Sequence, residues 1–193
     1  METFYSIQGE AFHQGEAAWF IRLAGCDVGC HWCDVKESWD EELHPDREAE
    51  DIVLELAKSG APIAVITGGE PTMHNLDVLT GAIRKIGVKT HLETAGVHPL
   101  TGTWDWICFS PKKFKKPLPG IYQRADELKI IVFNKHDLEW AEQHAALLPD
   151  SCKLYLQPEW DQRDSVIPMI LNYIRENPKW RLSLQIHKYI GVP

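Results

Sequence analysis

Three of the five cysteines lie within eight residues, with the spacing Cys26-x3-Cys30-x2-Cys33. Thiolates held this close repel one another unless a cation lies between them, and zinc and iron–sulfur clusters are the occupants that prefer thiolate ligands. A structural zinc ion usually takes a fourth protein ligand, whereas three thiolates on a four-iron cluster leave one iron open. The spacing therefore predicts either a closed zinc site or a cluster with one iron free for chemistry.

The rest of the sequence offers possible fourth ligands for zinc and argues against a disulfide between the clustered cysteines. For zinc, the candidate fourth ligands are His31, His44 and Cys108. A disulfide is disfavoured, because no secretory pattern precedes the cysteines and thiols persist in a reducing compartment. Cys108 and Cys152 lie in apolar segments and are interpreted as buried small hydrophobic residues.

Apolar and amphipathic segments alternate along the chain. We expect strands over 17–23, 63–66, 88–93, 106–109, 128–133, 153–157 and 181–185, and helices over 45–59, 76–86, 137–147 and 165–176. Residues 4–16 are expected to form an exposed loop or hairpin. Strand–helix alternation predicts parallel pairing with right-handed crossovers. Prolines in the segment 94–126 exclude a long helix there, so at least one crossover helix is missing.

Chain length decides between a complete and a partial barrel. A complete eight-fold barrel needs about 250 residues, and this chain has 193. We therefore predict an α/β fold, an incomplete parallel β/α barrel, forming a single domain over residues 1–193.

Composition excludes several classes of function. A formal net charge of −8 disfavours nucleic acid as the main partner, because no overall positive field attracts phosphates. No apolar run approaches the roughly 20 residues that cross a bilayer, so no membrane association is expected. Free cysteines without an export signal predict a cytoplasmic protein.

Further motifs lie before and after the cysteines. Thr67-Gly68-Gly69-Glu70-Pro71 follows the apolar run 63–66, and with the cysteine spacing after a first strand it resembles the radical S-adenosylmethionine (SAM) superfamily. Phe4-Tyr5-Ser6-Ile7-Gln8-Gly9-Glu10 and Leu184-Gln185-Ile186-His187-Lys188 narrow the resemblance to the 7-carboxy-7-deazaguanine synthase family. It spans residues 2–193, nearly the whole chain.

The resemblance implies a partial barrel of the radical SAM type and a lyase of queuosine and other 7-deazapurine biosynthesis. In that family, a 4Fe–4S cluster and SAM generate a 5′-deoxyadenosyl radical. The radical starts conversion of 6-carboxy-5,6,7,8-tetrahydropterin to 7-carboxy-7-deazaguanine with loss of ammonia. The resemblance also implies Mg²⁺, a homodimer, and an electron donor such as flavodoxin or ferredoxin.

The same resemblance assigns roles to individual residues. The expected cluster ligands are Cys26, Cys30 and Cys33. The expected SAM contacts are Gly68, Gly69, Glu70, Thr94, Ser110 and Gln157. The expected substrate contacts are Gln8, Glu10, Arg22, His187 and Pro193, the last through its terminal carboxylate.

The residues on their own also permit structural roles. Polar residues after strands often serve as caps and turns. Arg22, inside an apolar strand, needs a partner, and an ion pair with Glu70 or Glu93 would supply one. Lys112 begins a run of lysines that fits either a solvated loop or an anion-attracting rim.

This sequence departs from the family pattern at three places. Val35 replaces a threonine that helps to hold Mg²⁺, and valine offers no oxygen to a hard cation; Asp34 and Ser38 are the candidate substitutes. Ala11 stands where the family often has glycine, and Ile186 replaces a threonine. The alternative functions are another small radical SAM enzyme, such as a glycyl-radical activase, and a non-enzymatic zinc-binding module.

Overall fold

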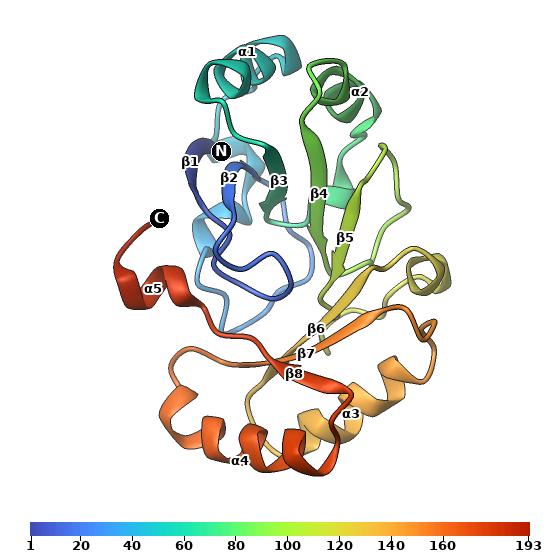
Figure 1. The fold of residues 1–193 in the computed structure, drawn as a ribbon. Helices are drawn as coiled ribbons and strands as arrows, with labels where there is room; N and C mark the ends of the chain where they lie inside the picture. The colour runs from blue at the N-terminus through green and yellow to red at the C-terminus, as the bar shows by residue number, and fades with distance from the viewer.

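Eight strands form one curved sheet in a computed structural model that describes residues 1–193 (Figure 1). They pair in the order of the sequence: β1 (Glu2–Ile7), β2 (Ala17–Leu23), β3 (Ile63–Gly68), β4 (Lys89–Thr94), β5 (Trp106–Phe109), β6 (Glu127–Val132), β7 (Lys153–Pro158) and β8 (Trp180–Leu182). β1 is antiparallel to β2, and all other pairs are parallel. β8 does not pair with β1, so the predicted incomplete barrel is confirmed.

The helices flank this sheet: α1 (Ala49–Ser59), α2 (Asp77–Lys85), α3 (His136–Ala145), α4 (Arg163–Glu176) and the short α5 (Ile186–Ile190). No α-helix connects β4 to β5, and a single 3-10 helix, Pro119–Gln123, lies between β5 and β6. The predicted gap in the crossover pattern is therefore confirmed. None of the helices combines the length and apolar character of a membrane-spanning segment.

Some predicted boundaries are wrong. α1 begins at Ala49 rather than at Pro45, because His44 and Glu48 have extended backbones, and a residue that precedes proline disfavours helical geometry. The helix ends before Gly60, which has φ +70, as the sequence predicts. The last strand ends at Leu182 rather than at 185, because its pairing with β7 ends at Leu182. Beyond it, the Ser183 and Gln185 side chains donate to Gln157 and Glu10.

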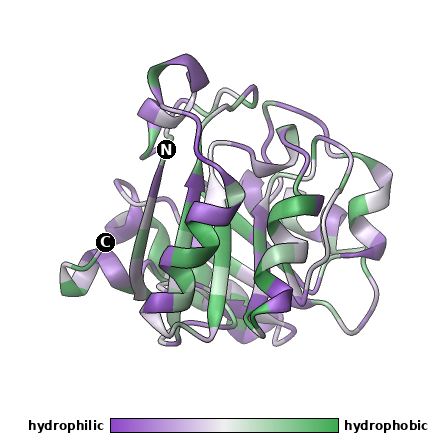
Figure 2. Cartoon of the chain, turned by 90° about the horizontal axis from the view of Figure 1, so that it is seen from above, coloured by the Kyte–Doolittle hydropathy of each residue, from purple (hydrophilic) through white to green (hydrophobic).

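Two apolar clusters hold the layers together. Leu128, Ile130 and Leu156 pack with Ile170 and Trp180 between the sheet and the helices α3 and α4. A second cluster, which includes Ile21, Leu56, Ile66 and Ile83, joins β2 and β3 to α1 and α2. Figure 2 shows this pattern as green strands in the middle of the molecule and helices with purple outer residues. Cys108 and Cys152 are buried, as predicted.

Candidate active site

The carboxyl ends of the strands surround a cavity of about 470 Å³. Parallel strands end on the same side of a β/α barrel, which is where ligands bind in this architecture. The cavity brings together every residue with a predicted site role: Gln8, Glu10, Arg22, Cys26, Cys30, Cys33, Gly68, Gly69, Glu70, Thr94, Ser110, Gln157, His187 and Pro193. Their individual roles stay predictions.

The three clustered cysteines form one wall of the cavity. All three are free thiols, and they pack with Val28 and Ala95. Backbone bonds anchor their loop: Gly25 N donates to Ser38 O at 2.7 Å, and Cys26 N donates to Trp39 O at 3.2 Å. Three thiols on one anchored loop fit the ligand set of a four-iron cluster.

The three residues considered as a fourth zinc ligand each have other contacts in the structure. Cys108 is buried on β5 and does not line the cavity, and the His44 ring contacts the Glu37 carbonyl at 2.8 Å. His31 lines the cavity, but its ring packs edge-on against Phe114. No group of three or more His, Cys, Asp and Glu side chains is gathered around a single metal position. Closure of a zinc site by Cys108 or His44 is therefore wrong.

Gly68 and Gly69 pack against the cysteine loop. Gly69 N donates to Leu23 O at 2.9 Å, and Glu70 N donates to Gly25 O at 2.8 Å. A Cβ on Gly69 would lie 2.1 Å from the Gly25 carbonyl oxygen, and one on Gly68 would lie 2.2 Å from that of Leu23. The contact between these loops therefore requires both glycines, whatever ligand lies beside them.

Glu70 joins the ends of β3 and β4. Its side chain, 2% exposed, accepts hydrogen bonds from Thr72 N at 3.2 Å, the Thr72 hydroxyl at 2.6 Å and Ala95 N at 2.7 Å, and also from the Thr94 hydroxyl. The carboxylate is thus occupied by protein donors. It fixes the neighbouring backbone of the cavity wall and orients Thr94.

Ser110, after β5, and Gln157, on β7, also line the cavity. Lys112 Nζ donates to Ser110 Oγ at 2.6 Å, and Ser183 Oγ donates to Gln157 Oε1 at 2.7 Å. Burial lowers the pKa of Lys112, which lies over the Trp32 ring. The neighbouring Lys113 and Lys115 form ion pairs with Asp137 and Asp27 and do not line the cavity. Lys112 is therefore the one member of the lysine run that faces the cavity.

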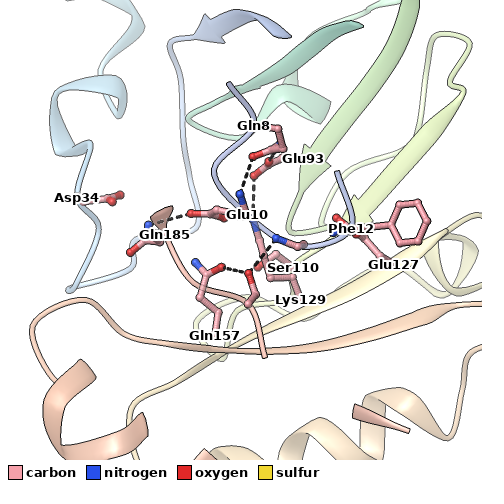
Figure 3. A network of polar contacts seen from close by, with 12 residues as sticks. Gln8, Glu10, Phe12, Asp34, Glu93, Ser110, Glu127, Lys129, Gln157 and Gln185 are labelled. Carbon is pink, nitrogen blue, oxygen red and sulfur yellow. Dashed lines mark hydrogen bonds and ion pairs between the residues drawn. The ribbon is translucent and has the colours of Figure 1, made fainter. Parts of the chain in front are cut away.

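A charged network lines the side of the cavity at the N-terminal segment (Figure 3). Lys129, on β6, donates to carboxylate oxygens of Glu10 and Glu93. Gln8 Nε2 donates to the other Glu93 oxygen at 3.0 Å, and Gln185 Nε2 donates to the other Glu10 oxygen at 2.9 Å. Burial alone would raise the pKa of Glu10, but the charge and hydrogen bond of Lys129 lower it to about 2.

Lys129, Glu93 and Gln185 are not among the residues predicted to bind the cluster, SAM or substrate, although all three line the cavity. The available signal was a lysine within the otherwise apolar run Leu128–Val132. A buried charge needs partners, but strand spacing alone does not tell which carboxylates approach it.

Arg22, on β2, also lines the cavity. Its guanidinium lies 3.3 Å from Glu2 and 5.4 Å from the centre of the Phe4 ring. The predicted ion pair with Glu70 or Glu93 is wrong, because the protein donors described above occupy those two carboxylates. The Arg22 side chain remains 24% exposed, with donors available to an anion in the cavity.

The C-terminal segment closes over the N-terminal one. Ile186 N donates to Gly9 O at 3.0 Å, and Ser6 Oγ donates to a main-chain oxygen of Pro193 at 2.8 Å. In Figure 1, α5 and the C-terminus accordingly lie beside the β1 end of the sheet. Burial lowers the pKa of His187, so its ring is available as a neutral donor and acceptor.

The oxygen ligands that magnesium needs are not gathered beside the cysteine loop. Val35 lines the cavity without an oxygen in its side chain. Asp34 forms an ion pair with Lys188 at 2.6 Å. Ser38 is fully buried, donates to the Val35 carbonyl and does not line the cavity, so it is wrong as a substitute ligand.

Comparisons with known proteins agree with this site. The Radical SAM superfamily matches residues 20–109. The chain is 50% identical to a 7-carboxy-7-deazaguanine synthase of Flavobacterium psychrophilum over 193 residues, which cover 100% of this chain and 91% of the relative. It is 46% identical to the Synechocystis enzyme of the same name over 99% of this chain and 91% of the relative.

Structure comparison gives the same family. The crystal structure of QueE from Escherichia coli superposes with a TM-score of 0.85 at 32% identity, covering 95% of this chain and 91% of that chain. The synthase of Escherichia coli K12 is 36% identical over 99% of this chain and 97% of the relative. With its cysteine loop and glycine-rich loop meeting in one cavity, the chain belongs to the 7-carboxy-7-deazaguanine synthase family of radical SAM enzymes.

Proposed function

We propose that this chain is a radical SAM lyase that converts 6-carboxy-5,6,7,8-tetrahydropterin to 7-carboxy-7-deazaguanine and ammonia, a step of queuosine biosynthesis. The observation that carries the proposal is a single cavity with two chemically different walls. Free thiols line one wall, and the buried Lys129 network lines another. Membership of the synthase family supports the same reaction.

The cysteine wall is the proposed cofactor side. Cys26, Cys30 and Cys33 would hold a 4Fe–4S cluster, which together with SAM supplies the radical that abstracts hydrogen from the substrate. The Gly68-Gly69 backbone, held against the cysteine loop, presents polar groups to SAM. Glu70, as a positioning residue, fixes that backbone, and Thr94, Ser110 and Gln157 complete the SAM side.

The opposite wall is the proposed substrate side. Gln8 and Glu10 supply acceptors for N–H groups of the pterin, since the Gln8 amide oxygen and each Glu10 carboxylate oxygen keep a second lone pair after their protein hydrogen bonds. Arg22 supplies a guanidinium for the substrate carboxylate. His187 and Pro193 border the same space and would orient the pterin ring.

We assign no step to magnesium, because Val35, Asp34 and Ser38 do not form an oxygen ligand set. An external one-electron donor such as flavodoxin or ferredoxin, a homodimeric assembly and a cytoplasmic location accompany the proposal, and the family resemblance supports them. The reducing cytoplasm would keep the five cysteines as thiols.

The test is an anaerobic reaction of reconstituted protein with reductant, SAM and the carboxytetrahydropterin, analysed by mass spectrometry with and without magnesium. We expect the deazaguanine acid and ammonia in equal amounts, with similar yields in both arms. Formation of 5′-deoxyadenosine at the same rate without the pterin, and no deazaguanine, would instead favour an activase. Protein that binds zinc and neither iron nor sulfide would favour the zinc-binding module.

A further inference from the structure

Lys129 is the charged centre of the substrate wall. Its side chain is 5% exposed, and those of Glu10 and Glu93 are 12% and 22% exposed. The lysine bonds to both carboxylates, at 3.0 Å in the case of Glu93. These residues come from β6, from the loop after β1 and from β4, so one ammonium ties three separate parts of the chain together.

The bonds close into a ring (Figure 3). From Lys129 the ring passes through Glu93 to Gln8, whose amide donates to the second Glu93 oxygen at 3.0 Å. The side-chain oxygen Oε1 of Gln8 accepts from Glu10 N at 3.1 Å, and Glu10 returns to Lys129. Gln185 occupies the second Glu10 oxygen. Each carboxylate is thus held at both oxygens, which fixes its orientation toward the cavity.

Lys129 is the one cation that forms an ion pair with the two carboxylates of the ring. Two carboxylates face one ammonium, while the nearby Cys108, Lys112, Glu127 and His187 make no ion pair with either carboxylate. Burial raises the pKa of the Cys108 thiol and of the Glu127 carboxyl, which favours their neutral forms, so neither needs a share of the Lys129 charge. Without Lys129, two buried carboxylates would face each other, and such pairs respond by taking up a proton or moving apart.

We propose that Lys129 is a positioning residue for the substrate, because it pairs with Glu10 and Glu93 and orients both carboxylates to accept hydrogen bonds from the pterin. This inference rests on the proposed function. Both bonding partners of the ammonium are carboxylates of the protein, so Lys129 acts on the substrate through Glu10 and Glu93. Its loss therefore raises KM more than it lowers kcat.

The test compares Lys129→Met, the charge-matched double variant Lys129→Met/Glu93→Gln, and Lys89→Met as the control at an exposed strand start. We expect Lys129→Met to raise KM for the pterin about tenfold or more, with a smaller change in kcat. Removing one carboxylate along with the lysine relieves the repulsion, so the double variant should have a lower KM than Lys129→Met. Lys89→Met should match the wild type.

A second readout does not need turnover. The thermal midpoint of Lys129→Met should fall more at pH 8.5 than at pH 6, because proton uptake relieves the carboxylate pair at low pH, and the double variant should recover most of the loss. A pH-independent loss of the same size in both variants would overturn the proposal. So would a collapse of kcat with unchanged KM. If the wild type does not convert the pterin, the proposed function fails, and the thermal comparison still tests the charge balance of the ring.

Discussion

His187 lies directly against the backbone of Gly9: a Cβ placed on Gly9 would lie 2.0 Å from Nδ1 of the His187 ring. The Gly9 carbonyl also accepts a hydrogen bond from Ile186 N at 3.0 Å, which fixes the segment that carries His187. The glycine between Gln8 and Glu10 is therefore required by a contact between the two ends of the chain. This contact places His187 in the substrate cavity.

Gly9→Ala should therefore displace the His187 ring and reduce kcat/KM by about 10-fold to 100-fold, since a shift near 1 Å has such effects at an active site. In the double variant Gly9→Ala/His187→Ala, the added methyl group no longer meets a ring, and the Cβ of residue 187, at 3.0 Å, is the part of that side chain that remains beside it. Its kcat/KM should therefore fall little below that of His187→Ala alone. Gly81→Ala is the control, because a Cβ there meets nothing within 4 Å. Additive losses in the double variant would contradict this account.

Cys30→Ala should abolish iron binding and turnover together, because the remaining two thiolates of the loop do not complete a cluster. Cys152→Ala is the matched control, since Cys152 is buried but does not line the cavity. Iron and sulfide content after anaerobic reconstitution is the measurement. Full iron content in Cys30→Ala, or its loss in Cys152→Ala, would contradict the assignment.

His91 should make the folded state acid-sensitive. It is 4% exposed, and burial together with the charge of His13 lowers its pKa from 6.5 to about 3. As pH falls, the unfolded chain takes up this proton first, so stability is lost from about pH 6.5 downward and levels off near pH 3. Between pH 7 and pH 4 we expect this histidine to account for a loss of about 3 kcal/mol in the free energy of unfolding.

The measurement is urea unfolding of the wild type and of His91→Leu across this pH range. The variant should show a shallower pH dependence. His136→Leu, at the exposed start of α3, should follow the wild type. Equal slopes in the wild type and His91→Leu would contradict this prediction.

Ala11 has a left-handed backbone with φ +53, and it is the one non-glycine residue in the chain with a positive φ. For a residue with a Cβ, this backbone conformation costs roughly 1–2 kcal/mol. Replacement by glycine removes that cost, but the greater conformational freedom of glycine in the unfolded chain offsets part of the gain in stability. Ala11→Gly should therefore stabilise the protein by about 0.5 kcal/mol. The control Ala146→Gly, at φ −64, should destabilise it. If Ala11→Gly and Ala146→Gly shift the thermal midpoint in the same direction, the backbone strain assigned to Ala11 is contradicted.

The parts of the fold that depend on local sequence could be predicted. Apolar runs such as 63–66 and 153–157 mark strands, and Gly60 marks a helix end, because these patterns act over a few residues. The cysteine spacing and the Gly68-Gly69 motif likewise identify the cavity wall. Their resemblance to a known family identifies the reaction that the wall serves.

The features that could not be predicted from the sequence depend on contacts between distant segments of the chain. The sequence shows that Lys129 needs a counterion, but Glu10 and Glu93 reach it only through the curvature of the sheet. Arg22 pairs with Glu2 instead of an interior carboxylate, because β1 adds antiparallel to β2 and places Glu2 opposite Arg22. The steric reason for Gly9 is also nonlocal, since His187 belongs to the last helix.

The most direct test of the central claim is an anaerobic crystal structure of the reconstituted protein with SAM and the carboxytetrahydropterin. We predict the cluster on Cys26, Cys30 and Cys33, SAM against the Gly68-Gly69 backbone, and the pterin within hydrogen-bond distance of Glu10 and Arg22. Pterin bound outside this cavity, or a pterin that contacts neither Glu10 nor Arg22, would contradict the account.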